Sequence, residues 1–231
     1  KKCTLSDYML GVIGIDSRMF TRATTKSDGS AGEFFSVIGM AVRIRDYEKF
    51  DIEYEKAMGE AFKENGLVKK YKYYCLNDFE GNELKDKIVE SFIEKIKEHI
   101  EKVHIFYALF SEDRIKRIKV YGRYSKRNGI KLNKPDRTQK QLIKEHLVNT
   151  FPGICAWRLM EFFSSSSVQF HIDFYEGHIS EAQEEFERGL FTKFVYPSGD
   201  CVNPVISTAD ILLGLFDKRL SEKKLYLLFE N

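Results

Sequence analysis

The sequence contains few of the residues that mark several classes of protein. Its 231 residues include four cysteines and four prolines, and no two cysteines form a C-x-x-C pair. This spacing excludes a close-spaced zinc knuckle and argues against a disulfide framework, so a reducing cytoplasm is the expected compartment. No apolar run approaches the ~20 residues of a membrane-spanning helix, and the N-terminus lacks the apolar stretch of a secretory signal. We therefore expect no membrane partner.

What the sequence does contain is typical of one globular domain. Hydrophobic residues make up 43% of the chain and charged residues 31%, which separates it from disordered sequences. No segment is rich enough in proline or serine to act as a long linker, and no internal repeat is present. We predict a single domain over residues 1–231, long enough to bury a core without disulfides.

Hydrophobic periodicity predicts strands and helices in an alternating order. Strands are expected at 8–15, 34–42, 71–76, 103–110, 168–174 and 191–196; the runs 8–15 and 103–110 predict buried strands, and 191–196 an edge strand. Helices are expected at 47–65, 83–101, 138–149, 154–163, 180–188 and 206–220, with Pro152-Gly153 as an interruption. The short gap between the first two strands predicts an antiparallel hairpin. The fold class is therefore α/β, with a mixed sheet, antiparallel N-terminal strands and helices on both faces.

Three aspartates lie at positions where a sheet of this kind gathers its ligands. Asp16 follows the first strand, Asp173 lies at the end of the strand 168–174, and Asp210 lies in the first turn of the last predicted helix. In open α/β sheets, ligands bind outside the carboxyl ends of strands, so these side chains could converge. Carboxylate oxygens are the ligands that Mg²⁺ prefers, and two such ions can clamp both oxygens of a phosphodiester displacement.

Each aspartate also has a structural interpretation. Asp16 could be a turn residue, and Asp210 could favour the positive end of its helix while completing a capping box with Ser207. Asp173 is harder to explain in that way, because an unpaired acid among aromatic and aliphatic neighbours is costly to bury. We interpret His171 as a packed or surface residue that reaches the face of Asp173 only where the strand is irregular.

The order of these motifs resembles the ribonuclease H-like fold, and specifically the family called domain of unknown function 3800. Members begin with a strand that ends in Asp, often followed by Glu-Ser-Gly, and close with a helix of the type Q-x-A-D-x-x-A-G. The matching segments here are GIDS at 14–17, FSVIGM at 35–40, HID at 171–173 and STADILLG at 207–214. The resemblance implies a nuclease or phosphodiester-transfer protein that depends on Mg²⁺ or Mn²⁺, with Asp16, Asp173 and Asp210 as catalytic metal ligands.

The sequence also departs from this family pattern. Asp16 is followed by Ser17-Arg18 where the family has Glu, and Ser207 replaces the usual Gln. A fourth carboxylate is not obvious. The candidates are Glu60, Asp78 and Glu176, of which Asp78 and Glu176 are preferred because they lie near predicted strand ends. These departures leave open a catalytically inactive module that binds nucleic acid or assembles with other proteins, or a structural domain of a larger assembly.

A strongly basic segment separates the two halves of the chain. Between Arg114 and Lys144 there are twelve Lys or Arg and one acid, a charge of +11, so the rest of the chain carries 2 minus 11, or −9. We predict a basic insertion at about 114–137 that contacts a nucleic-acid backbone. The expected contact residues are Arg117, Lys119, Arg123, Lys126, Arg127 and Lys131. The alternatives are a solvated charged face, and the acidic remainder of a second copy in a homo-oligomer.

Overall fold

The computed structural model describes a core of strands and helices drawn from most of the chain. The described residues are 11–25, 29, 31–68, 83–111, 148, 151–156, 158–159, 168–174, 193–197 and 199–221. The predicted strand 71–76, the predicted helix 180–188 and the basic insertion at 114–137 lie outside these residues. Among the described helices, none is both long enough and apolar enough to cross a membrane.

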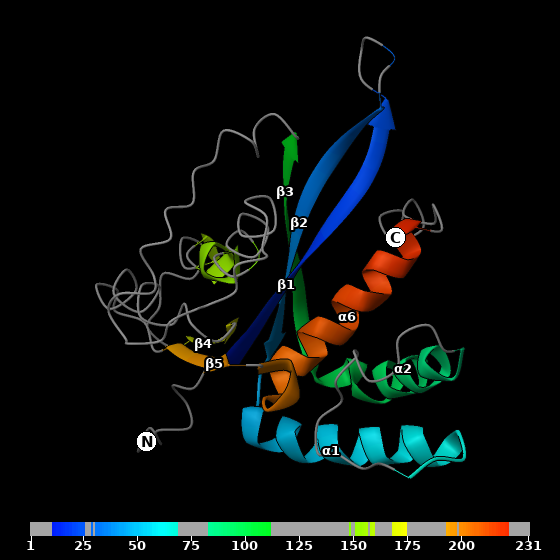
Figure 1. The fold of residues 1–231 in the computed structure, drawn as a ribbon. Coiled ribbons are helices and arrows are strands. Elements are labelled where there is room, and N and C mark those ends of the chain that lie inside the picture. Colours follow the sequence, from blue (N-terminus) through cyan, green and yellow to red (C-terminus); the bar gives the residue numbers. More distant parts are fainter. Residues whose placement is uncertain are drawn as a thin grey trace, which may run out of the picture.

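The centre of the fold is a five-stranded sheet with the order β3-β2-β1-β4-β5. Its strands are β1 (Gly11–Thr25), β2 (Ala31–Ile44), β3 (Ile100–Ser111), β4 (Val168–Phe174) and β5 (Lys193–Pro197). The pairs β1–β2 and β2–β3 are antiparallel, whereas β4 runs parallel to β1 and β5 runs parallel to β4. Figure 1 shows β1 and β2 as a long twisted hairpin. The predicted α/β class, a mixed sheet with antiparallel N-terminal strands, is confirmed.

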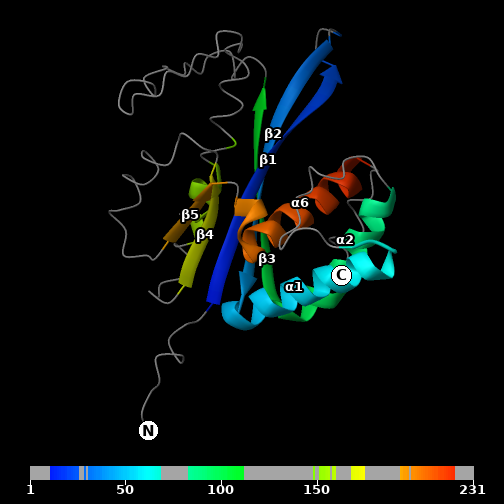
Figure 2. The same cartoon turned by 60° about the horizontal axis from the view of Figure 1, so that its bottom comes forward.

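Three helices cover one face of this sheet. They are α1 (Tyr47–Glu64), α2 (Glu83–Ile96) and α6 (Pro204–Ser221), and Figure 2 shows them together on one side. Apolar side chains of all three pack with Val12, Ile38 and Met40 of the sheet in one buried cluster. The opposite face is covered by the helical residues 151–156 and 158–159. Helices therefore lie on both faces, as the sequence predicts.

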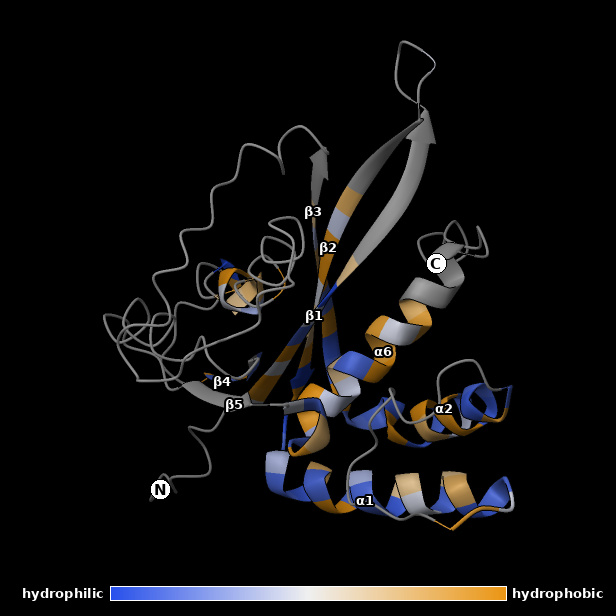
Figure 3. Ribbon diagram, viewed as in Figure 1, coloured by the Kyte–Doolittle hydropathy of each residue, from blue (hydrophilic) through white to orange (hydrophobic). Residues whose placement is uncertain are grey.

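The helices α1 and α2 form because each carries an apolar stripe of helical period. Figure 3 shows polar and apolar residues interleaved along both. Asp46 caps α1 by accepting a hydrogen bond from the Lys49 backbone N–H at 3.0 Å, and Gly66, with φ of +73°, follows its end. The rings of Tyr54 and Phe92 meet edge to face across the two helices, with centroids 4.9 Å apart. This pair fixes α2 against α1 rather than directly against the sheet.

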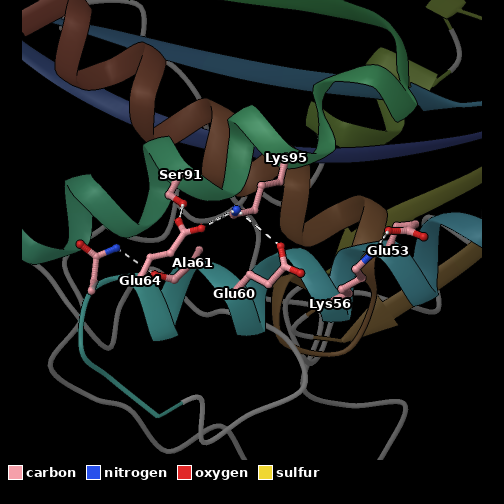
Figure 4. A network of polar contacts seen from close by, with 8 residues as sticks. Glu53, Lys56, Glu60, Ala61, Glu64, Ser91 and Lys95 are labelled. Atoms are coloured by element: carbon pink, nitrogen blue, oxygen red, sulfur yellow. Dashed lines mark hydrogen bonds and ion pairs between the residues drawn. The ribbon is translucent and has the colours of Figure 1, made fainter.

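Polar contacts close the solvent side of the α1–α2 pair. Lys95 lies 2.7 Å from Glu64 and 3.5 Å from Glu60, and Ser91 donates a hydrogen bond to Glu64 at 2.6 Å (Figure 4). Because these side chains are accessible to solvent, water screens the ion pairs and they contribute little to stability. The network therefore orients the two helices more than it stabilises them.

Several predicted boundaries were wrong. The strand β1 continues to Thr25, so Asp16 lies inside a strand and not at its end. The helix α2 ends at Ile96 and passes through a 3₁₀ turn, η3 (Lys97–His99), into β3. β3 is an edge strand, and its alternate residues Val103, Ile105 and Tyr107 are exposed rather than buried. Pro152 and Gly153 lie within the helical residues 151–156 and do not interrupt them.

Two glycines of the sheet allow helices to approach it closely. A Cβ atom at Gly14 would lie 2.5 Å from the backbone carbon of Val205 on α6, and one at Gly39 would lie 2.5 Å from the Sγ atom of Cys155 on the other face. Both separations are shorter than any real Cβ contact. The small-residue positions in the two N-terminal strands therefore set the distance between the sheet and the helices on each face.

Gly14→Ala tests the close approach of α6. The added methyl group meets backbone rather than a flexible side chain, so we expect a loss of about 1–3 kcal/mol in the free energy of unfolding. Gly59→Ala is the matched control, because Gly59 lies within α1 with open space around it and should gain about 0.5–1 kcal/mol. Urea unfolding measures both. Equal stability of Gly14→Ala and wild type would contradict the close contact.

Candidate functional site

The side chains that face α6 are set by the alternation of the strands. Gly14 of β1 lies against Val205, so Asp16 and Arg18, two and four residues further on, point to the same face. In the parallel pairing of β1 with β4, the last matched residues are Ile15 and Ile172. The next residue of β1 is Asp16 and the next of β4 is Asp173. These two aspartates therefore lie at matching positions on neighbouring strands, beneath the first turns of α6.

The start of α6 is held in place by a buried cap that the sequence analysis did not anticipate. Asn203 accepts hydrogen bonds from the backbone N–H groups of Val205 and Ile206, both at 3.1 Å, and Pro204 occupies the first helical position. The amide of Asn203 also donates to Nδ1 of His171 at 2.8 Å and to the hydroxyl of Tyr47 at 3.4 Å. The cap thus ties α6 to β4 and to α1.

His171 is a packed residue, as predicted, but the argument about its face was wrong. The pairings of β4 on both sides run without a register shift, and residues two apart in a regular strand share a face. His171 and Asp173 therefore both point toward α6 with no irregularity. Burial lowers the pKa of His171 to about 4, so its ring is neutral at pH 7 and accepts from Asn203.

The central feature of the site is a carboxyl pair formed by Asp16 and Asp210. Asp16 is 8% exposed and Asp210 is 5% exposed, and each carboxyl group influences the pKa of the other. Burial, above all, and then the negative charges of Asp210 and Asp173 raise the pKa of Asp16 well above its usual range. The neutral form of Asp16 is therefore favoured in the folded protein.

The charge of Asp210 is partly compensated by a neighbouring arginine. Burial raises the pKa of Asp210, and the nearby charge of Arg18 opposes that rise. The guanidinium of Arg18 lies 3.0 Å from Oδ1 of Asp210 in an ion pair. Two carboxyl groups held together in this way are unfavourable at neutral pH unless a proton or a cation lies between them.

Two further acids lie beside this pair. Asp173 accepts a hydrogen bond from the backbone N–H of Gly199, in the short 3₁₀ turn η5 (Gly199–Cys201) that leads into α6. A Cβ atom on Gly199 would lie 3.0 Å from Oδ1 of Asp173, so glycine permits this approach. Asp200, the next residue, raises the pKa of Asp210 through its charge. Asp200 is thus the additional carboxylate that the structure brings to the site.

Asp200 was not among the predicted residues. Its neighbour Gly199 and its place just before the capped helix were the signals in the sequence, but a Gly-Asp pair is far more often an ordinary turn. None of the three candidates for a fourth carboxylate is found at the site among the described residues. Glu60 lies on α1 and pairs with Lys95 at 3.5 Å, away from the aspartates, whereas Asp78 and Glu176 lie outside the described residues. The six predicted nucleic-acid contacts also lie outside them: Arg117, Lys119, Arg123, Lys126, Arg127 and Lys131.

The alternative interpretation of Asp210 as part of a capping box was wrong. α6 begins at Pro204, so Asp210 lies in its second turn, and the hydroxyl of Ser207 bonds to that of Tyr54 at 2.7 Å. Ser17, in the position after Asp16, faces the other side of the sheet and donates to the backbone carbonyl of Val148 at 2.7 Å. Ser17 contacts the carboxyl pair only through its backbone N–H, which donates to Oδ1 of Asp16 at 2.7 Å.

The donor chemistry of the site suits a hard cation. Among the described residues, no group of three or more His, Cys, Asp or Glu side chains is assembled as a metal cage. Mg²⁺, however, usually takes only one or two protein carboxylates and completes its shell with water and substrate phosphates. Asp16 and Asp210 supply two such groups side by side, with Asp173 and Asp200 adding negative charge. The residues present therefore fit Mg²⁺ or Mn²⁺.

Comparison with known proteins shows the family of this chain. The sequence profile described as Domain of unknown function (DUF8203) matches residues 22–231. An uncharacterised protein of Archaeoglobus fulgidus (strain ATCC 49558 / DSM 4304 / JCM 9628 / NBRC 100126 / VC-16) is 26% identical over 155 residues. That alignment covers 63% of this chain and 40% of the relative, so the chain spans less than half of the relative's length.

Two solved structures are similar in outline. One is the ribonuclease HII in its complex with PCNA from Archaeoglobus fulgidus, with a TM-score of 0.44, 12% identity, and coverage of 96% of this chain and 79% of that one. The other is ribonuclease H2 from Pyrococcus horikoshii OT3, with a TM-score of 0.42, 11% identity, and coverage of 95% and 78%.

Asp16→Asn tests the raised pKa of Asp16. An amide has nearly the shape of a protonated carboxyl group, but it never ionises. Because the pKa of Asp16 is raised in the folded state, the unfolded chain ionises from about pH 4 upward while the folded chain resists. Wild-type stability should therefore fall relative to Asp16→Asn as the pH rises from 5 to 8 in EDTA.

Thermal unfolding at each pH measures this difference. Asp86→Asn is the control for loss of one negative charge, because Asp86 lies in the first turn of α2, which contributes no side chain to the site. A stability difference between Asp16→Asn and wild type that stays constant from pH 5 to pH 8 would contradict the raised pKa.

Proposed function

The chain belongs to the family DUF8203, and we propose that it is a divalent-metal-dependent nuclease or phosphodiester-transfer protein that acts on nucleic acid. The single observation that carries the proposal is the buried pair of acids Asp16 and Asp210, which raise each other's cost of ionisation, with Asp173 and Asp200 beside it. Protein interiors rarely keep carboxylates so close, because each raises the cost of ionising the next. A divalent cation bound at such a site would offset the repulsion between the carboxylates.

Asp16 and Asp210 would hold the cation directly, and Asp173 is the third predicted ligand. Bound Mg²⁺ or Mn²⁺ supplies a Lewis acid that polarises a phosphodiester oxygen and lowers the pKa of water. Asp16 would bind the cation as the carboxylate, so cation binding would oppose the rise in its pKa. The N–H of Gly199 orients Asp173, and the close seating of α6 on Gly14 keeps Asp210 at a constant distance from β1.

The charge distribution supports a polyanionic substrate. The segment from Arg114 to Lys144 carries +11, whereas the rest of the chain carries −9. A basic segment in the same chain as an acidic site that would bind a cation suits nucleic acid, because the phosphates would bind the basic residues and the cation. Arg117, Lys119, Arg123, Lys126, Arg127 and Lys131 are the proposed backbone contacts.

A second candidate function is a catalytically inactive module on the same fold. The observations that favour it are the Ser17-Arg18 sequence where members of domain of unknown function 3800 often have Glu, and the ion pair that Arg18 makes with Asp210. A module of this kind would keep the basic segment and bind nucleic acid or protein without chemistry. The two candidates differ in what becomes of the substrate.

Cleavage of labelled single- and double-stranded DNA and RNA, with Mn²⁺, Mg²⁺ or EDTA, tests the proposal. We expect cutting that requires the metal and falls by roughly 100-fold or more in Asp16→Asn and Asp210→Asn. Even the replacement of a residue that only contacts a metal ligand typically lowers metal affinity or activity by about 10–100-fold. Asp86→Asn on α2 is the matched control and should cut like wild type.

Two results would count against the nuclease. Cleavage that persists in EDTA or in both site variants would locate the activity elsewhere or in a contaminant. An absence of cleavage, together with salt-sensitive binding that survives both substitutions, would favour the inactive module.

A further inference from the structure

Arg18 has an unusual place for a basic residue in an acidic site. It lies on β1 two residues beyond Asp16 and on the same face, and its guanidinium pairs with Asp210 at 3.0 Å. Its side chain is 34% exposed, whereas that of Asp210 is 8% exposed. Among the residues that the structure describes, Arg18 is the only basic side chain in an ion pair with Asp210.

The charge balance around Asp210 explains why such a residue is needed. Asp16, Asp173 and Asp200 contribute the other acidic groups of the site. A buried carboxylate with acidic neighbours is costly unless a positive charge compensates it. Arginine supplies that charge at every accessible pH, since its guanidinium does not lose its proton in proteins. The ion pair therefore occupies the role that a metal ion would otherwise fill at Asp210.

A metal and Arg18 cannot both make their best contact with Asp210. A divalent ion bound to this carboxylate would lie within a few ångströms of the guanidinium, and the two positive charges repel in a site that is largely shielded from water. The guanidinium of Arg18 can move away from Asp210 into solvent, because its side chain is long and already 34% exposed. Asp210, on the helix, stays where it is.

We propose that Arg18 is a resident counter-cation: it neutralises Asp210 while no metal is bound, and it competes with the divalent ion for that carboxylate. This inference rests on the proposed function, because it presumes that the carboxyl pair binds a divalent ion. Arg18 is then a positioning residue that sets the metal affinity of the site. The protein keeps its carboxyl pair stable without metal at the expense of weaker metal binding.

A purely structural role makes a different prediction. If Arg18 only fastens β1 to α6, its removal should lower stability and leave the metal affinity unchanged or weaker. If it is a counter-cation, its removal should lower the stability of the metal-free protein and tighten metal binding at the same time. These opposite signs make the two roles separable.

Calorimetric titration of the full chain with Mn²⁺ is the deciding measurement. We expect Arg18→Gln to bind Mn²⁺ roughly 5- to 10-fold more tightly than wild type, as removal of a nearby like charge should allow. Arg18→Lys, which keeps the charge, should bind much as wild type does. Arg45→Gln is the matched control, because Arg45 pairs with Glu101 at 3.5 Å on an 80% exposed side chain. Arg45→Gln should bind as wild type does.

Thermal unfolding gives a second readout that needs no activity. In EDTA, Arg18→Gln should unfold at a lower temperature than wild type, and saturating Mn²⁺ should raise its Tm by more. In an Asp210→Asn background, Arg18→Gln should no longer change the Mn²⁺ affinity, since the competition requires that carboxylate. If Arg18→Gln does not fold, Arg18→Met keeps the aliphatic stem and is held to the same criteria.

The outcomes separate this inference from the proposed function. If wild type binds Mn²⁺ and Arg18→Gln binds it equally or more weakly, the counter-cation is wrong and the metal site stands. If neither protein binds Mn²⁺ at millimolar concentrations, the metal site itself is wrong, and the inference is overturned with it.

Discussion

The seating of α6 on β1 is the contact on which the site depends. Gly14 has no side chain, so the backbone of Val205 comes close enough that even a methyl group would not fit. That approach places Asp210, in the second turn of the helix, against Asp16 in the strand. The capping of α6 by Asn203, which also contacts His171 and Tyr47, fixes the direction of the helix at the same point. The close contact between helix and strand thus brings two carboxyl groups near enough to interact.

This arrangement stores an electrostatic cost in the centre of the fold. Burial and the mutual repulsion of the acids raise the pKa of both Asp16 and Asp210. The surrounding core is apolar and tightly packed, so the cost does not relax by movement of the helix. Instead, the guanidinium of Arg18 partly offsets it. The same features that destabilise the site are those that would favour a divalent ion.

The sequence was informative about this site to a limited depth. Asp16, Asp173 and Asp210 could be singled out because each interrupts an apolar segment, and because strand ends in a parallel arrangement lie at one edge. The strand itself was underestimated, since β1 continues past Asp16 into a long hairpin with polar residues that conceal its extent. Asp200 and Arg18 gave no comparable signal. An acid in a turn and an arginine in a polar stretch are both ordinary in sequence.

The order of the described strands and helices and the antiparallel beginning were determined by the sequence alone, because periodicity and turn residues act over a few neighbouring positions. The tertiary structure decided which acids meet. Asp16 and Asp210 are separated by almost the whole described chain, and their contact depends on a glycine, a helix cap and the register of β4 against β1. The partnership of Arg18 with Asp210 was decided there too, since only packing brings a side chain of β1 within 3.0 Å of one on α6. Local patterns specify elements, whereas charge balance in a buried site is a property of distances that exist only after the elements have packed.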